Sequence, residues 1–177
     1  MASHAPAALF IQDVGRQLGQ ALQGADTLAE KRRRLEPFIA RVVDVPAVAR
    51  FCLGRYWRVA TPEQRQRFTG LFLRSLANAV ALRAGSYQTG LGHVIVQQPV
   101  ARPDGIYVPT LVQPQGKPEV HVAWIVEADH APMQIIDVTA EGMSLRLAKR
   151  SDFTAYIAQH GGDIDRFLDA LQRQLAA

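Results

Sequence analysis

The sequence has little of what sites of covalent or metal chemistry need. Its 177 residues include one cysteine, Cys52, so no disulfide can form within the chain. Cys52 lies between Phe51 and Leu53, and in that apolar setting we expect a small buried side chain rather than a reactive thiol. The five histidines lie far apart, and none belongs to a His-Glu-x-x-His or Cys/His pattern with ligand spacing. The sequence therefore predicts no metal site.

Signals for membrane insertion and for nucleophilic catalysis are also missing. No uninterrupted apolar stretch approaches the roughly 20 residues that cross a bilayer, which predicts a soluble chain. Residues 1–6 have neither the basic nor the apolar segment of a secretory signal, so either the protein is cytosolic or an export signal has been removed. Ser144 does not stand in a Gly-x-Ser-x-Gly motif. We expect Gly142 to be a turn residue with positive φ and Ser144 to make a local hydrogen bond.

Charge of one sign is in modest excess, with 20 Lys and Arg against 16 Asp and Glu. The densest cationic run is 31–34, and Glu30 and Glu36 stand beside it. Glu30 and Arg34 have the spacing of an ion pair along a helix. The run is expected to form a solvated helix face, with contact to lipid head groups or an acidic partner as the alternative. Base-stacking aromatics do not alternate with these charges, which argues against nucleic-acid binding.

The first half of the chain has the three- and four-residue apolar spacing of amphipathic helices. This spacing predicts helices over 7–22 and 26–40, the second capped by Asp26. Asp44 before Pro46 predicts the start of a third helix. Thr61 and Gln64 form a capping-box pattern that predicts a long helix up to about Arg83.

After Gly90 short β-branched runs separated by turn residues replace the helical spacing. They predict four antiparallel strands, at 93–97, 106–112, 119–126 and 133–138. A helix starting at Ser151 or Asp152 and a last one capped by Asp163 follow. The order predicts an α+β fold in which a twisted antiparallel sheet of about four strands packs against a layer of helices. We expect one domain over 1–177, with a helical part 7–84, a sheet 92–139 and C-terminal helices 151–175.

Three stretches carry a resemblance to a known family. The first runs from Ile135 through Asp137-Val138 and Glu-Gly-Met-Ser-Leu to Arg150-Ser151-Asp152-Phe153. The second is 44–57, which ends in Gly-x-x-Trp, and the third is the Thr-x-x-Gln helix start at Thr61. Together they resemble the MlaC and toluene-tolerance family of periplasmic phospholipid-binding proteins. One departure is the segment 75–79, Ser-Leu-Ala-Asn-Ala, where close family members tend to have a Tyr-Ala pair.

The resemblance implies a lipid carrier rather than an enzyme, with an apolar cavity between sheet and helices. The cargo would be a phospholipid held by its acyl chains, with no cofactor. The implied location is the periplasm, after removal of an export signal. The implied partners are an inner-membrane ABC-type transporter complex and an outer-membrane lipoprotein complex, in a system linked to membrane lipid asymmetry and toluene tolerance. We expect a monomer.

The residues predicted to line this cavity come from apolar faces and from the family motifs. Tyr56 and Trp57 are expected at its mouth, because their amphipathic rings tolerate a wet edge. The full predicted set is Phe51, Tyr56, Trp57, Phe68, Phe72, Leu76, Val108, Val122, Trp124, Val138 and Phe153.

Three alternatives remain at this point. A carrier of the same family could take hopanoids, whose rigid rings need a differently shaped cavity. A cone-shaped α+β enzyme could use Asp137 as a base with a raised pKa in an apolar pocket. A partner-binding module with a solid core could dock through its basic second helix.

Overall fold

The computed structural model describes residues 4–84, 93–113, 116–127, 129 and 131–177. Five helices come first in the chain: α1 (Ala5–Leu22), α2 (Leu28–Val42), α3 (Val45–Leu53), α4 (Tyr56–Val59) and α5 (Pro62–Ala84). The strands follow: β1 (His93–Val96), β2 (Val100–Arg102), β3 (Gly105–Gln113), β4 (Val120–Glu127), β5 (Gln134–Ala140) and β6 (Met143–Ser144). Two helices end the chain: α6 (Leu145–Gln159) and α7 (Ile164–Ala176). The predicted α+β class is confirmed.

Side-chain caps fix where most helices begin. The amide of Gln64 donates to Thr61 Oγ1 at 3.1 Å and the amide of Thr61 donates to Gln64 Oε1 at 2.9 Å, which confirms the capping box. Asp44 accepts from the amide of Ala47 as predicted. Asp26 is not the cap of α2, because Thr27 accepts from the amide of Glu30 instead. That one-residue error arose because both residue types are good caps.

The start of α6 was predicted wrongly. The helix begins at Leu145, with Ser144 as its cap accepting from the amide of Leu147, and not at Ser151 or Asp152. Its first turn is exposed on both sides, so apolar spacing gave no helical signal there. Gly142 has φ +80°, as expected of the turn before it. Asp163 caps α7 as predicted.

The sheet is antiparallel throughout, with strand order β1-β3-β4-β5-β6 and β2 paired to β3 beside β1. All four predicted strands are present. Two short ones were missed, β2 and β6. Strands of two and three residues are too short to show an alternating pattern.

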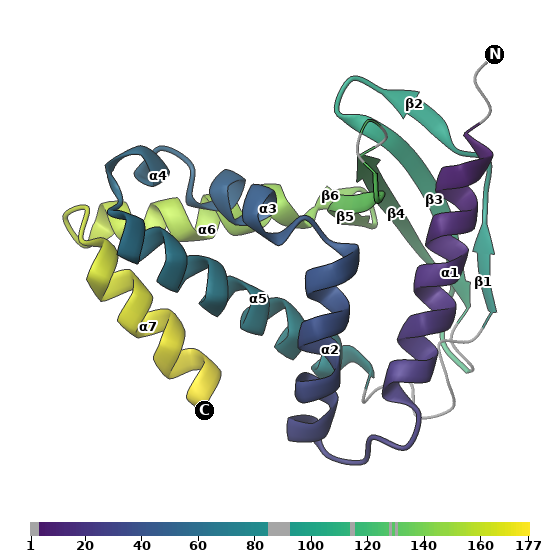
Figure 1. Ribbon diagram of the computed structural model, residues 1–177, viewed down its shortest axis with the longest axis horizontal. Helices are drawn as coiled ribbons and strands as arrows, with labels where there is room; N and C mark the ends of the chain where they lie inside the picture. The colour runs from purple at the N-terminus through teal and green to yellow at the C-terminus, as the bar shows by residue number, and fades with distance from the viewer. Residues whose placement is uncertain (1–3, 85–92, 114–115, 128, 130) are drawn as a thin grey trace.

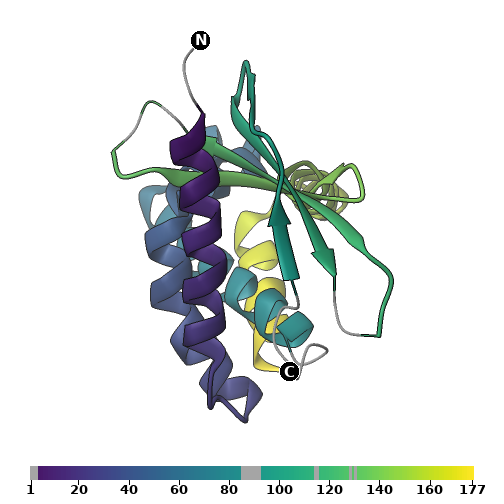
Figure 2. The same ribbon diagram turned by 90° about the vertical axis from the view of Figure 1, so that its right-hand side faces the viewer.

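The helices lie on one face of this twisted sheet and extend well beyond it (Figures 1 and 2). α1 packs beside β1 and β3, whereas α2, α3 and α6 approach β5 at the other side. α5, α6 and α7 form a separate helical layer next to α3, away from the sheet (Figure 1). Sheet and helical layer meet where α2 and α3 join, since the amide of Asp44 donates to the carbonyl of Ile135 in β5.

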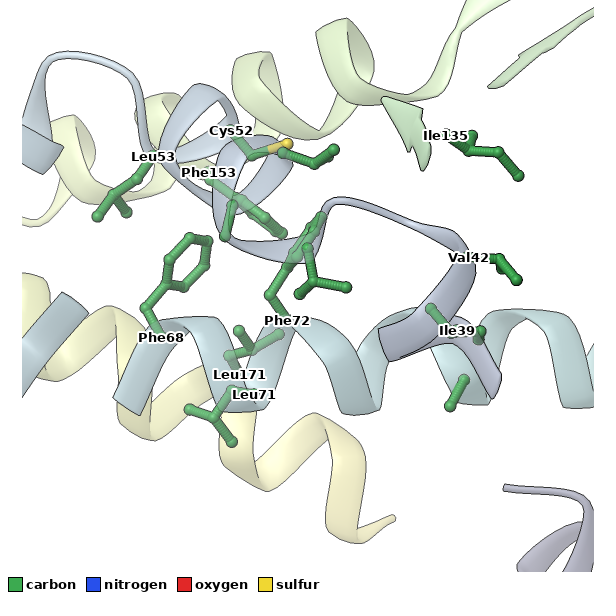
Figure 3. Packing of buried hydrophobic residues seen from close by; sticks show 14 of the residues in the cluster. Ile39, Val42, Cys52, Leu53, Phe68, Leu71, Phe72, Ile135, Phe153 and Leu171 are labelled. Carbon is green, nitrogen blue, oxygen red and sulfur yellow. The ribbon is translucent and has the colours of Figure 1, made fainter. Parts of the chain in front are cut away.

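The centre of the helical layer is a closed cluster of phenylalanines. Phe68 of α5 has ring centroids 5.8 Å from Phe72, 5.8 Å from Phe153 of α6 and 5.9 Å from Phe167 of α7. The rings of Phe68, Phe72 and Phe153 point toward one another (Figure 3). These four side chains are at most 8% exposed. The helices are therefore held together by interlocking rings, an arrangement that adds to the free energy of simple burial.

Candidate functional site

The face of the sheet that looks toward the helices carries a row of apolar side chains. Strand register places Val108, Trp124 and Val138 side by side across β3, β4 and β5, with Val122 next to Trp124 along the same face. The structure thus brings together the four strand residues predicted for the site. The row crosses the centre of the sheet, whereas the helices that approach the sheet closely do so near its two sides.

Burial on this inner face falls from one end of the sheet to the other. Ile106, Val108, Val126 and Ile135 are at most 8% exposed and belong to the main core. Toward the other end four apolar side chains of the inner face are only partly buried, Val112, Val120, Val122 and Ala140, while Thr110 among them is buried. Protein atoms therefore cover one end of the face completely and the other end incompletely.

Two helices show the same gradient. In α1, Ala7, Ile11 and Val14 are buried, whereas Leu18 and Leu22 are only partly buried. In α5, Phe68, Leu71 and Phe72 are buried in the first half, whereas in the second half Ala77 and Ala81 are buried but the larger Leu76 and Val80 are only partly buried. The C-terminal ends of α1, α5 and β3 all lie toward the bottom of Figures 1 and 2. Apolar side chains from three elements are thus incompletely covered at the same end of the molecule.

The polar groups of this inner face are satisfied within the protein. Trp124 Nε1 donates to Thr110 Oγ1 at 3.2 Å, and Thr110 Oγ1 donates to the carbonyl of Val122 at 2.6 Å. Thr110 is only 1% exposed. Because these donors already have partners, the surface that Trp124 and Val122 offer to a ligand is hydrocarbon, and it suits acyl chains or rings better than a polar molecule.

The predicted site residues in the helical layer lie elsewhere. Phe68, Phe72 and Phe153 fill the closed ring cluster. Of the α5 residues predicted for the site, Leu76 is the one in the partly buried half of that helix. Four partly buried apolar residues at the same end of the molecule are not in the predicted set, namely Leu18, Val80, Val112 and Val120.

The third group, Phe51, Tyr56 and Trp57, is covered by guanidinium groups. Arg146 and Arg150 lie over the ring of Phe51 at 4.7 and 4.9 Å from its centroid.

The neighbouring α4 repeats this arrangement. Arg55 lies over Tyr56 at 5.0 Å, and Arg65 lies over Trp57 at 5.3 Å while donating to its carbonyl. Stacked arginines surround these three aromatic rings, and the rings are not part of the inner face of the sheet.

Asp137 joins the sheet to α6. It is 7% exposed, and its carboxylate accepts from the hydroxyl of Ser144 at 2.5 Å and from the amides of Val138 at 2.8 Å and Arg146 at 3.1 Å. Arg146 Nε lies 3.4 Å from the same carboxylate, and Arg146 also pairs with Asp104 in the β2–β3 turn. Because these donors occupy the carboxylate, Asp137 has a structural role, and the enzyme alternative finds no base here.

Cys52 is the buried small residue that its apolar neighbours predicted. Its side chain is fully buried, and its thiol donates to the carbonyl of Arg146 with a sulfur to oxygen distance of 3.6 Å. Burial, helped by the negative charge of Asp137, raises the pKa of the Cys52 thiol to about 12. The thiolate is thus suppressed at neutral pH, which disfavours nucleophilic or metal chemistry at Cys52.

The outer surface of the helical layer has an open groove of about 590 Å³ between α2, α5 and α7. Charged and amide side chains make up most of its lining, namely Glu36, Glu63, Gln66, Arg67, Arg74 and Gln172. Gly70, Leu71 and Leu73 complete its lining. Within the described part of the chain, no helix is long and apolar enough to span a bilayer. The same residues contain no cluster of three or more His, Cys, Asp or Glu that could hold a metal ion.

The fold and the apolar inner face define an α+β protein suited to holding hydrophobic molecules. A family model described as MlaC protein matches residues 11–173, and the chain belongs to the MlaC family. Its fold is similar to that of a phospholipid-binding protein from Ralstonia solanacearum, solved in complex with a phospholipid. The two chains match over 100% of each, with a TM-score of 0.75 and 23% sequence identity. The family resemblance drawn from the sequence motifs is thus confirmed.

Proposed function

We propose that this protein is a phospholipid carrier that holds acyl chains against the inner face of its sheet. The observation that carries the proposal is the row of apolar side chains that protein atoms cover incompletely, from Val122 and Trp124 to Leu76 and Val80. Burying acyl chains there yields about 0.8 kcal/mol for each methylene removed from water. A site of this kind offsets the cost of taking a lipid out of a bilayer. Membership of the MlaC family and the phospholipid in the Ralstonia neighbour support this cargo.

The site as proposed uses Val108, Val122, Trp124, Val138 and Leu76 from the predicted set. To these it adds partly buried residues from the same end of the molecule: Leu18, Val80, Val112 and Val120. Phe68, Phe72 and Phe153 support the site from the closed helical layer, and the mouth assigned to Tyr56 and Trp57 is not part of it.

Family membership also supports the cellular role, which we propose as transport without covalent chemistry. The protein would work in the periplasm as a monomer of one lipid-binding domain. It would move phospholipid between an outer-membrane lipoprotein complex and an inner-membrane ABC-type transporter complex, and so affect lipid asymmetry and solvent tolerance.

The direct test is mass spectrometry of an organic extract from protein purified without detergent. The proposal expects a phospholipid in near-stoichiometric amount. A hopanoid in its place would identify the related carrier class. The absence of any lipid from exported protein would contradict the proposal.

Two valine-to-tryptophan substitutions in strands test whether the lipid binds at the inner face of the sheet. Val122→Trp adds bulk to the inner face, whereas Val100→Trp adds the same bulk at a residue that is 52% exposed in β2. Displacing about two methylenes should reduce bound lipid about tenfold in Val122→Trp. Val100→Trp should retain the wild-type amount. Equal lipid content in the two variants would show that the lipid binds elsewhere.

A further inference from the structure

One surface of the molecule gathers cations that the proposed lipid site does not use. The segment 45–60, which spans α3 and α4, has Arg50, Arg55 and Arg58 and no acid. α6 adds three more cations against the single acid Asp152. We call the six cations the arginine surface: Arg50, Arg55, Arg58, Arg146, Lys149 and Arg150. The two segments hold six of the 20 cations of the chain and one of its 16 acids, a net charge of +5, so the rest of the chain has a net charge of −1.

Tertiary packing brings the two segments together. Arg146 and Arg150 of α6 both lie over Phe51 of α3. A Cβ atom on Gly54 would lie 3.2 Å from Arg150 Nε, so this guanidinium rests against the turn between α3 and α4. Figure 1 shows α3 and α4 alongside α6 on one edge of the helical layer, with α6 starting at the sheet and α4 at the end far from it. Arg146 and Arg150 thus lie against the segment that carries Arg50, Arg55 and Arg58.

Most of this charge has no internal partner. Among the described residues, Arg146 is the one member of the arginine surface in an ion pair with a carboxylate. The run 31–34 on α2 differs, because Arg34 pairs with Glu30 at 2.5 Å and donates to the carbonyl of Gln23. One of the four cations of this run is thus paired with a carboxylate, compared with one of the six on the arginine surface.

We propose that the arginine surface adsorbs to an anionic phospholipid bilayer. Its aromatic rings hold Arg55, Arg146 and Arg150 in place, and a guanidinium binds a phosphate group through two parallel hydrogen bonds. Apolar side chains stand exposed on the same elements, with Val59 at 72% and Leu147 at 58%. Cations interspersed with exposed aliphatic side chains match the chemistry of a lipid head-group layer better than that of an acidic protein surface.

Adsorption would be distinct from cargo binding. It uses the outside of α3, α4 and α6, whereas the proposed lipid site uses the inner face of the sheet. A protein held at a bilayer by this surface would keep the inner face free to exchange a lipid.

The test is co-sedimentation of the protein with vesicles of phosphatidylcholine mixed with phosphatidylglycerol, compared with pure phosphatidylcholine. Arg50→Glu combined with Arg58→Glu reverses two exposed charges that have no side-chain hydrogen bond or ion pair in the described structure. We expect at least a tenfold loss of binding to the anionic vesicles, on the basis of about 1 kcal/mol for each cation near such a surface. Wild-type binding should weaken steeply with salt, because exposed charges are screened.

The matched control reverses two exposed arginines outside this surface, Arg33→Glu and Arg173→Glu, and so changes the net charge equally. It should lose less than about threefold. Arg50→Gln combined with Arg58→Gln should give an intermediate loss of binding to the anionic vesicles. This variant tests the proposal even where charge reversal impairs folding. Equal losses in the control, equal binding to neutral vesicles, or no binding by wild type would each overturn the proposal. The last outcome would leave an acidic protein as the partner class. Unchanged lipid content in the variants would separate this result from the fate of the carrier proposal.

Discussion

The helical layer and the inner face of the sheet are both rich in large apolar side chains, but only the first is closed. Phe68 and Phe72 are at most 1% exposed and meet Phe153 and Phe167 ring against ring. Trp124 and Val122 on the sheet are only partly buried. The difference teaches that apolar content does not distinguish a core from a binding site. What distinguishes them is whether another part of the chain supplies the opposing atoms.

The largest expected effect is on the closed side. Phe68→Ala should lower the free energy of unfolding by about 3–5 kcal/mol, because the ring leaves a cavity among three others that cannot collapse fully. Urea unfolding followed by circular dichroism measures this. A loss below about 1 kcal/mol would mean that the ring cluster is as loosely packed as the sheet face.

The next largest effect is expected at Asp137, where the sheet contacts α6. Asp137→Ala leaves the Ser144 hydroxyl and two amides without their acceptor and removes the buried ion-pair partner of Arg146, and should cost about 2–4 kcal/mol. Asp104→Ala removes the other, exposed partner of Arg146 and should cost less than about 1 kcal/mol. Equal losses in the free energy of unfolding for the two variants, in the same urea assay, would show that the burial of Asp137 does not increase its contribution to stability.

The closed side should also respond to alkaline pH through Cys52. In the unfolded chain the thiol ionises near its ordinary pKa of 9.0, whereas in the folded protein its pKa is about 12. The stability from burying the neutral thiol is therefore complete below pH 9 and is lost as pH rises toward 12. At about pH 10.5 the loss relative to about pH 8 should be about 2 kcal/mol greater in wild type than in Cys52→Ala. Parallel pH profiles for the two proteins would contradict this.

The smallest effect on the free energy of unfolding is expected at the partly buried end of the inner face of the sheet. Val108 is fully buried and Val122 only partly buried on the same sheet face, so the two valines form a matched pair. In protein stripped of lipid, Val108→Ala should cost about 2 kcal/mol and Val122→Ala less than about 1 kcal/mol. Added phospholipid should raise the stability of wild type more than that of Val122→Ala, because a ligand stabilises according to its affinity. An equal cost for both valines would remove the distinction between closed and open regions.

Local chemistry was predictable in this chain. The capping box at Thr61 and the caps Asp44 and Asp163 all follow from interactions within a few residues. The start of α6 was not predicted, because Leu145 and Leu147 are exposed and the apolar spacing on which the prediction relied is absent there. The missed strands β2 and β6 have two or three residues and depend on their partners for definition.

The same contrast between local and long-range interactions applies to the predicted site residues. The strand residues Val108, Val122, Trp124 and Val138 could be predicted as one set, since strand pairing puts every second side chain on one face. The predicted aromatic residues could not be sorted in the same way. Phe68 meets other rings in the helical layer and Phe51 meets two arginines from α6, and both contacts cross about 85 to 100 residues of sequence.

The sequence by itself determined the longer helices and strands, their order, the α+β class and the family, because caps, spacing and motifs are local properties of the chain. Only the tertiary structure decided which apolar faces are fully covered by other parts of the chain. It also decided that Asp137 contacts α6 from the sheet and that arginines of α6 lie beside those of α3 and α4. Burial and charge density are properties of neighbours in space, and in this chain those neighbours come from distant parts of the sequence.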